Sequence, residues 1–305
     1  MNAEQSPLTI AAALARATAR LQAAPSATPG AAAGDGPGAG PDAAAGCSLD
    51  AQLLLAHTLA RPRSALLAHD TDALRPEQAD AFDRLVARRA RGEPLAYITG
   101  RKQFWTLELR VTPDVLVPRP ETELLVERAL ALVPAPEARV ADLGTGSGAI
   151  ALALASERPR WRITATDKSS TALAVAEANA RALNVGNVRF AGGAWFDPIA
   201  GERYDLIISN PPYIAAHDRA LEDPALRHEP PAALSSGPTG LEALAALIGG
   251  AGSYLAAAGW LLLEHGANQQ QAVADLLVAQ GFAHVRCHAD LAGLPRVTEA
   301  QWPAA

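Results

Sequence analysis

The chain has 305 residues, of which 49% are apolar, and it carries a formal net charge of −6 at pH 7. This length is enough to bury one large core and a smaller second one, so we expect one or two domains. The negative charge argues against a protein that grips nucleic acid along its backbone, because phosphates are neutralised by clustered lysine and arginine. We therefore expect a soluble, enzyme-sized chain that acts on a protein or a small molecule, with no nucleic acid as partner.

The cysteines and histidines predict neither a disulfide framework nor a metal site. Cys47 and Cys287 are far apart and stand outside any CxxC spacing. None of the seven histidines belongs to a HExxH helix or to another metal-ligand spacing. We expect two packed thiols in a reducing compartment and no metal.

The sequence predicts no targeting segment and no membrane partner. Glu4 precedes the first basic residue, Arg16, and the N-terminus lacks the long apolar run of a signal peptide. Residues 243–263 contain no charge, but glycines interrupt them, so a helix, a turn and a buried strand explain them better than a membrane span. We expect a cytoplasmic protein, and a monomer.

Residues 1–92 are expected to form a small helical domain. Apolar spacing predicts helices over residues 8–21, 49–59, 65–67 and 76–91. Residues 23–46 contain no large apolar side chain to offset the entropy of ordering, which predicts a flexible low-complexity insertion.

Residues 93–118 are expected to connect this domain to the rest of the chain through a β-hairpin. Phe104, Trp105, Leu107 and Leu109 come close to the alternation of strands. The following PRPETE segment has prolines that end regular structure and acidic residues that suit the first turn of a new helix.

Residues 119–305 are expected to form one α/β domain. The predicted strands are residues 140–143, 162–166, 188–191, 204–209 and 260–264, and the predicted helices are residues 149–156, 171–183, 241–255 and 268–280. Alternating strands and helices imply a mostly parallel, doubly wound sheet, which binds ligands at the carboxyl ends of its strands.

A glycine-rich turn follows the first of these strands, in the segment DLGTGSGAIAL. Gly144, Gly146 and Gly148 can adopt backbone conformations closed to other residues and can let a ligand approach closely. Their GxGxG spacing differs from the GxGxxG of dinucleotide-binding folds, which weakens a nicotinamide hypothesis. A tight turn without a ligand is the alternative.

Asp167 ends the next strand, about 20 residues after the glycine turn, where an acidic residue meets ribose hydroxyls in nucleoside-binding α/β folds. The alternative is a helix N-cap. The glycine turn and Asp167 occur together in one βαβ unit. This combination favours nucleoside binding over a turn without a ligand and over a helix N-cap.

The segment SNPPYI, after another apolar strand, points to the reaction. The side-chain oxygen of Asn210 and the carbonyl of Pro211 can accept both hydrogens of a planar NH₂ group, and Tyr213 offers an aromatic face to that plane. An amide nitrogen is a poor nucleophile, and such acceptors stabilise the positive character that it gains during attack on a methyl group. A rigid loop after a strand is the alternative for a Pro-Pro pair alone.

These motifs resemble those of the release-factor glutamine methyltransferases, the protein N5-glutamine methyltransferases that modify the Gly-Gly-Gln loop of class 1 release factors. The resemblance is nearly end to end and includes DAQLLLAHTL, PLAYITGRKQFW, VLVPRPETE, DLGTGSGAIAL, SNPPYI, HEPPAAL, GLEAL, LLLEHGANQ and RVTEAQW. It implies a seven-stranded, Rossmann-like methyltransferase domain that uses S-adenosyl-L-methionine, with a helical domain and a hairpin that dock the release factor.

The resemblance also implies roles for single residues. The residues implied to bind the cofactor are Gly144, Thr145, Gly146, Ser147, Gly148, Asp167, Trp195 and Asn210, with Asp167 on the ribose and Trp195 near the adenine. Asn210, Pro211, Pro212 and Tyr213 are implied to hold the substrate glutamine, and Asn210, Pro211 and Tyr213 to serve catalysis.

The chain departs from the family pattern in two places. Ala194 stands where the family often has an acidic residue, so adenine recognition is expected to rely on backbone groups and on Trp195. Residues 23–46 are longer than the family's usual turn, which leaves the geometry of the first helix open.

Two other functions compete with this one. An adenine-N6 methyltransferase makes the same demand on Asn-Pro-Pro-Tyr, but it must hold a nucleic-acid backbone with cationic residues, and this chain is acidic. A non-enzymatic binding protein with a vestigial cofactor site would not need the intact glycine turn, Asp167 and Asn210.

Overall fold

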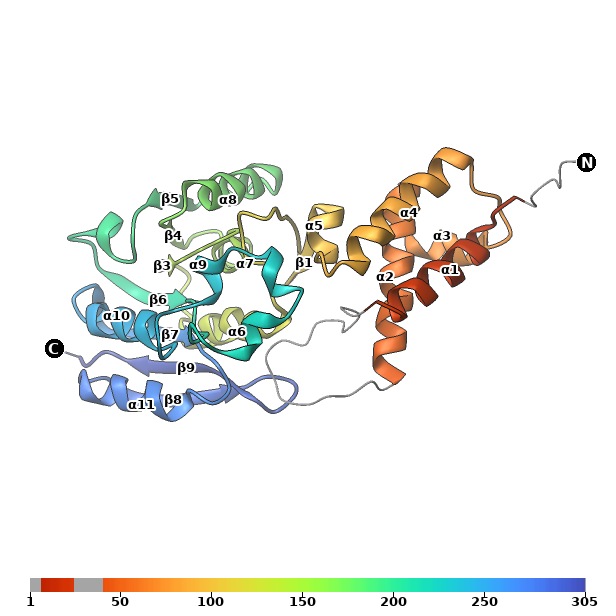
Figure 1. The fold of residues 1–305 in the computed structure, drawn as a ribbon. Coiled ribbons are helices and arrows are strands. Elements are labelled where there is room, and N and C mark those ends of the chain that lie inside the picture. The colour runs from red at the N-terminus through yellow and green to blue at the C-terminus, as the bar shows by residue number, and fades with distance from the viewer. Residues whose placement is uncertain (1–6, 25–40, 305) are drawn as a thin grey trace, which may run out of the picture. The chain divides into compact units, whose positions relative to one another are not determined.

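The structure is a computed structural model that describes residues 7–24 and 41–304 (Figure 1). It divides into two compact units. One unit runs to Gly100 and also contains Asp223–His228, and the other contains Arg101–Glu222 and the chain from Glu229 onward. The helix Leu95–Thr99, which belongs to the expected connecting segment 93–118, groups with the first unit.

The first unit is helical, as the sequence predicts. Its helices are α1 (Ile10–Gln22), α2 (Pro41–Leu59), α3 (Arg63–Ala68), α4 (Pro76–Ala90) and α5 (Leu95–Thr99). Thr9 caps α1 by accepting the backbone N–H of Ala12 at 3.2 Å. Apolar faces at helical spacing meet in a core that includes Ile10, Leu54 and Phe82.

The predicted flexible insertion overlaps α2. This helix begins at Pro41, so the prediction of flexibility is wrong for residues 41–46, and residues 25–40 lie outside the described part of the chain. Alanine explains the difference, because its helix propensity lets a short alanine run extend a helix that packs further along. The side chains of Cys47, Ala51 and Leu54 provide that packing.

The predicted hairpin is present and groups with the second unit. Strands β1 (Arg101–Phe104) and β2 (Leu107–Arg110) are antiparallel, and Phe104 pairs with Leu107 across the turn. Trp105 in the turn donates its backbone N–H to Glu123 and its indole N–H to Glu157, both at 2.8 Å. The hairpin is thereby tied to the α/β domain.

The second unit contains the expected seven-stranded sheet, in the order β5-β4-β3-β6-β7-β9-β8. The strands are β3 (Arg139–Leu143), β4 (Arg162–Asp167), β5 (Val188–Gly192), β6 (Tyr204–Ser209), β7 (Leu255–Glu264), β8 (Ala283–Ala289) and β9 (Pro295–Gln301). Strands β3 to β7 pair in parallel, whereas β9 is antiparallel to both of its neighbours. The prediction of a doubly wound, mostly parallel sheet is confirmed.

Helices cover both faces of the sheet (Figure 1). The longer helices of this unit are α6 (Glu123–Leu132), α7 (Ala149–Glu157), α8 (Ser170–Ala182), α10 (Glu242–Ala251) and α11 (Gln270–Ala279). Alternate strand residues point to opposite faces, so Leu206 packs in the core with α6 and α7, and Ile207 packs in the core with α10 and α11. Residues 243–263 form α10, a turn and β7, as predicted, and no helix within the described ranges is long and apolar enough to span a membrane.

The strands β8 and β9 were not predicted from the residue pattern. In β9 the buried positions include Arg296, Thr298 and Glu299, so the strand has no apolar run. Glu299 accepts a hydrogen bond from Arg128 of α6 at 3.0 Å. This partner comes from a distant part of the chain and leaves no local signal.

Candidate active site

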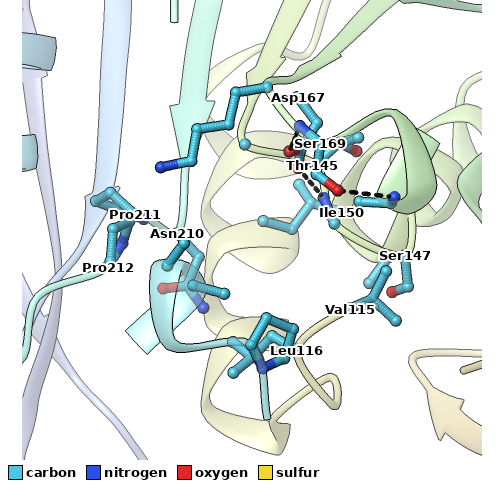
Figure 2. A pocket seen from close by; sticks show the side chains of 18 of the residues that line it. Val115, Leu116, Thr145, Ser147, Ile150, Asp167, Ser169, Asn210, Pro211 and Pro212 are labelled. Atoms are coloured by element: carbon cyan, nitrogen blue, oxygen red, sulfur yellow. Dashed lines mark hydrogen bonds between the residues drawn. The ribbon is translucent and has the colours of Figure 1, made fainter. Parts of the chain in front are cut away.

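A cavity of about 370 Å³ opens at the carboxyl ends of the parallel strands, where the fold class predicts a ligand (Figure 2). Its lining comes from the loops after β3, β4, β5 and β6, from the segment before α6, and from the short helix α9 (Pro231–Leu234). Among the expected site residues, it brings together Gly144, Thr145, Gly146, Ser147, Asp167, Trp195, Asn210, Pro211 and Pro212. Gly148 and Tyr213 do not line it.

The turn after β3 has the backbone that its glycines permit. Gly144 has a φ of 77°, and a Cβ placed there would lie 3.4 Å from the ring of Trp195. Gly148 has a φ of 84°, and its added Cβ would lie 3.0 Å from Leu152 and 3.2 Å from Ala176. Gly148 thus allows α7 to pack closely, whereas Gly144 keeps the cavity open beside Trp195.

Asp142, the next-to-last residue of β3, stabilises this turn by hydrogen bonds. Its Oδ2 accepts the hydroxyl of Thr145 at 2.6 Å and the N–H of Ala151 at 3.2 Å. The side chain is fully buried, and its Oδ1 has no hydrogen-bond partner among the described residues. Burial is the main cause that raises the pKa of Asp142 to about 7, and the charge of Asp167 adds to it.

Asp167 lies at the end of β4 and faces the cavity (Figure 2). Its Oδ2 accepts the N–H of Gly146 at 2.9 Å, and its Oδ1 accepts the N–H of Ser169 at 2.9 Å. The N-cap of α8 is Ser169, whose hydroxyl accepts the N–H of Ala172 at 3.1 Å. Asp167 is therefore not the helix cap, and each of its oxygens retains a lone pair that can accept a ligand hydroxyl.

Trp195 also lines the cavity. Its backbone adopts a φ of 45°, and its carbonyl accepts the hydroxyl of Thr166 at 3.3 Å. Gly193 and Ala194 also line this wall and offer no side-chain hydrogen-bonding group. Any ligand at this wall meets an aromatic side chain and backbone atoms.

Asn210 follows β6 directly and enters the cavity together with Pro211 and Pro212 (Figure 2). Its Nδ2 donates to the hydroxyl oxygen of Thr122 at 3.0 Å. Because the amide nitrogen is engaged there, the Oδ1 of Asn210 is the end of the side chain left for a ligand. The expected binding of an NH₂ group requires an acceptor at this position.

Tyr213 points away from the cavity. Its hydroxyl donates to Oε1 of Glu264 at 3.4 Å, and its ring packs against the core under α10 and α11. Burial raises the pKa of Tyr213 above its ordinary value, and the charge of Glu264 adds to the increase. The expected stacking of this ring on a planar substrate group has no counterpart in the cavity lining.

Three site residues were missed by sequence reasoning. Thr122 holds Asn210, and Glu264 lies behind Tyr213. Glu229 forms a salt bridge with Arg119 and accepts the N–H of Val117 at 3.0 Å. The PRPETE and HEPPAAL segments contain two of these residues, but only their long-range contacts show what they do.

The buried carboxylate of Glu229 joins two walls of the cavity. Arg119 and Pro230 both line it, and Glu229 directly precedes Pro230 in the chain. Because the side chain of Glu229 is buried, losing Arg119 would leave an uncompensated charge. No cluster of histidine, cysteine and acidic side chains suited to a metal ion occurs within the described residues.

Family models match two parts of the chain. The PrmC N-terminal domain matches residues 44–100, and the methyltransferase small domain matches residues 120–237. The fold is also similar to that of a methyltransferase from Pyrococcus furiosus, with a TM-score of 0.51 and 19% identity over 72% of this chain and 98% of that one. This likeness confirms the fold that the sequence analysis expects.

Curated relatives match the chain more extensively. The release factor glutamine methyltransferase of Pseudomonas aeruginosa is 47% identical over 254 residues, which cover 83% of this chain and 92% of that one. The protein of the same name from Xylella fastidiosa is 49% identical over 256 residues, covering 84% of this chain and 93% of that one. Identity of this extent over most of both chains shows that the protein belongs to the release factor glutamine methyltransferase family.

Proposed function

We propose that the protein transfers a methyl group from S-adenosyl-L-methionine to the side-chain amide nitrogen of the glutamine in the Gly-Gly-Gln motif of class 1 release factors. The observation that carries this proposal is the position of Asn210. Asn210 lines a cavity that also contains Asp167 and the glycine turn, and because its Nδ2 is bonded to Thr122 at 3.0 Å, its Oδ1 is the end left to accept from a ligand. A nucleoside site and an acceptor for an NH₂ group therefore share one cavity.

The residues of the cavity fit S-adenosyl-L-methionine. Asp167 has carboxylate lone pairs for the two ribose hydroxyls, since each oxygen accepts only one backbone N–H. The glycine turn leaves open the volume that a Cβ at Gly144 would fill beside Trp195, so Gly144–Gly148 can border the methionine part and Trp195 the adenine. When bound, this cofactor supplies an electrophilic methyl group on a positively charged sulfur.

The chain contributes position and electrostatics to the transfer. Asn210 Oδ1 and the carbonyl of Pro211 accept the two hydrogens of the glutamine NH₂ and aim its nitrogen into the cavity. The nitrogen gains positive charge as the N–C bond forms and the methyl–sulfur bond breaks, with the electron pair of the broken bond left on the sulfur. The acceptors stabilise this charge until one of the two hydrogens leaves as a proton to water. Pro211 and Pro212 keep the backbone rigid, so that the acceptors are arranged before the substrate binds.

The helical first unit and the hairpin are proposed to dock the release factor, which the family resemblance implies. The match of residues 44–100 to the PrmC N-terminal domain supports a family-specific role for the first unit. We propose that the enzyme is cytoplasmic, since its substrate is a translation factor, and that it is a monomer.

Incubation of the protein with a purified class 1 release factor and methyl-labelled cofactor tests the proposal. We expect one methyl group on the glutamine of the Gly-Gly-Gln motif, located by mass spectrometry of the peptides. A release factor with glutamate at that position is the matched control and should remain unlabelled there. Duplex DNA in a parallel reaction tests the adenine-N6 alternative, and label on adenine with none on the release factor would replace the proposed function.

A further inference from the structure

Two neighbouring hydrogen-bonded pairs of polar side chains lie at the Asn-Pro-Pro-Tyr segment, and of their members Asn210 and Thr122 line the cavity, whereas Tyr213 and Glu264 do not. Asn210 Nδ2 donates to Thr122 Oγ1 at 3.0 Å, and Tyr213 Oη donates to Glu264 Oε1 at 3.4 Å. Burial raises the pKa of Glu264 to about 7, and the neighbouring hydroxyl of Thr122 opposes this increase. Glu264 thus bonds Tyr213 at one end of the Asn-Pro-Pro-Tyr segment and lies near Thr122, which bonds Asn210 at the other end.

The sheet brings Glu264 to this position. It is the last residue of β7, and Leu263 before it pairs with Ser209, the residue before Asn210 in the neighbouring strand. Glu264 is only 1% exposed, and its Oε2 forms no hydrogen bond of ordinary geometry with any described residue. A carboxyl group so deeply buried and incompletely bonded has a considerable desolvation cost.

We infer that Glu264 is a positioning residue for the methyl transfer, and that its carboxylate sets the orientation of the Asn210 amide through Thr122. The inference rests on the proposed function and deepens it. Glu264 does not line the cavity, so it acts on the substrate only through Asn210 and the adjoining backbone.

The direction of the hydrogen bonds explains how a carboxylate achieves this. An ionised carboxylate only accepts, so in the inferred arrangement it takes the single hydroxyl hydrogen of Thr122 and leaves the lone pairs of Thr122 for Asn210 Nδ2. A neutral carboxylic acid can donate to Thr122 instead, and the threonine hydrogen is then free to bond the oxygen of Asn210. The amide would turn its NH₂ to the cavity, where it repels the NH₂ of the substrate.

The charges around Glu264 are also specific. Arg296, 4% exposed, favours the carboxylate, but it is itself paired with Asp290 at 3.0 Å. Glu121 opposes the carboxylate. His265 follows in the chain, and burial lowers its pKa, so it adds little positive charge near neutral pH. These contributions leave the pKa of Glu264 at about 7, mainly because of burial.

The first test is single-turnover methyl transfer to the release factor at saturating cofactor. The rate is measured from about pH 5.5 to about pH 8.5, a range that extends to both sides of the pKa of Glu264. The wild-type rate should rise with pH through a midpoint near the pKa of Glu264, about 7. Glu264→Gln should lose this midpoint and be slower by about 10²-fold at the alkaline plateau, the cost of a misplaced reacting group. It should keep the wild-type dissociation constant for the cofactor.

Asp142→Asn is the matched control, because Asp142 has a similarly raised pKa, about 7, and lies behind the glycine turn. The methyl-transfer rate of this variant should rise with pH through the same midpoint as that of the wild type, whatever its maximal rate. A Glu264→Gln enzyme with the wild-type rate and pH profile would overturn the inference, and so would a midpoint that disappears only in Asp142→Asn.

The second test needs no release factor and no activity. The side-chain NH₂ signals of Asn210, assigned by their loss in Asn210→Ala, are followed by NMR of asparagine-labelled protein. They should shift with pH in the wild type with the midpoint of Glu264, and should not titrate in Glu264→Gln. Signals indifferent to pH in the wild type would contradict the inference even if methylation proceeds. Signals that titrate in a protein that methylates no glutamine would reject the proposed function and leave the link between Glu264 and Asn210 intact.

Discussion

Glu229 and Arg119 form a salt bridge that joins the segment before α6 to the segment that leads into α9, although 110 residues separate them in the chain. Glu229 also accepts the backbone N–H of Val117 at 3.0 Å. The side chain of Glu229 is 1% exposed and that of Arg119 is 31% exposed. Two walls of the cavity are therefore held together by one buried carboxylate.

Arg119→Ala should lower the free energy of unfolding by about 3 kcal/mol, because it leaves Glu229 buried and unpaired. Arg181→Ala is the control, since the pair of Arg181 with Glu177 is exposed and should contribute roughly 0–1 kcal/mol. Urea denaturation of both variants measures the difference. Equal losses would mean that the Arg119–Glu229 pair behaves as an ordinary surface ion pair.

Asp167→Ala should weaken cofactor binding by roughly 1–3 kcal/mol, because the ribose hydroxyls lose a charged acceptor and Gly146 loses its partner. Calorimetric titration of S-adenosyl-L-methionine measures the dissociation constant. Ser169→Ala removes the N-cap of α8 and leaves the Asp167 carboxylate in place, so it should affect stability more than affinity. An unchanged dissociation constant in Asp167→Ala would exclude this residue from the cofactor site.

The stability of the protein without cofactor should depend on Asp142. Its folded pKa, about 7, is raised above the unfolded value of 3.8, so its stabilising contribution is complete below the unfolded pKa and is lost as pH rises through 7. Between pH 5 and pH 8 the titration of Asp142 should lower the free energy of unfolding by roughly 2–3 kcal/mol.

Urea denaturation at these two pH values, with wild type and Asp142→Asn, isolates the effect of Asp142. The change in free energy of unfolding between the two pH values should be smaller in Asp142→Asn by that amount. An identical change in both proteins would show that the pKa of Asp142 is not raised in the folded state.

Gly144→Ala should impair cofactor binding beyond its effect on stability. Gly144 and Gly281 both have positive φ, at 77° and 88°, so alanine strains the backbone at either position by roughly 1 kcal/mol. Only at Gly144 does the added Cβ meet the ring of Trp195, at 3.4 Å, whereas nothing lies within 4 Å at Gly281. Calorimetry should show weaker cofactor binding in Gly144→Ala and unchanged binding in Gly281→Ala, and equal affinities would separate Gly144 from the site.

The parts of the site that could be predicted are those where one residue type meets a local requirement. Glycines are required by the turn after β3, Asp167 ends β4, and Asn210 directly follows β6. Such positions follow from the order of strands and turns, because parallel strands bring their carboxyl ends to one edge of the sheet. The helical first unit and the mostly parallel sheet were predictable for the same reason, from periodicity along short segments.

The parts that could not be predicted depend on contacts between distant residues. Thr122 reaches Asn210 across 88 residues, and Glu229 reaches Val117 across 112. The orientation of Tyr213 toward Glu264 reverses the expected direction of its side chain, because a buried carboxyl accepts its hydroxyl. Neither β8 nor β9 shows an apolar pattern, and in β9 the buried Glu299 is bonded by Arg128 of α6.

Single-turnover methyl transfer by Asn210→Ala, at saturating cofactor, tests the central claim most directly. Because Asn210 Oδ1 is proposed to hold and polarise the glutamine amide, the rate should fall by about 10²–10³. The cofactor dissociation constant should change far less, since Asp167 and the glycine turn remain. Wild-type enzyme should label the glutamine of the Gly-Gly-Gln motif and leave a glutamate variant unlabelled there. A near-normal rate in Asn210→Ala, or undiminished labelling of the glutamate variant at another residue, would contradict the account.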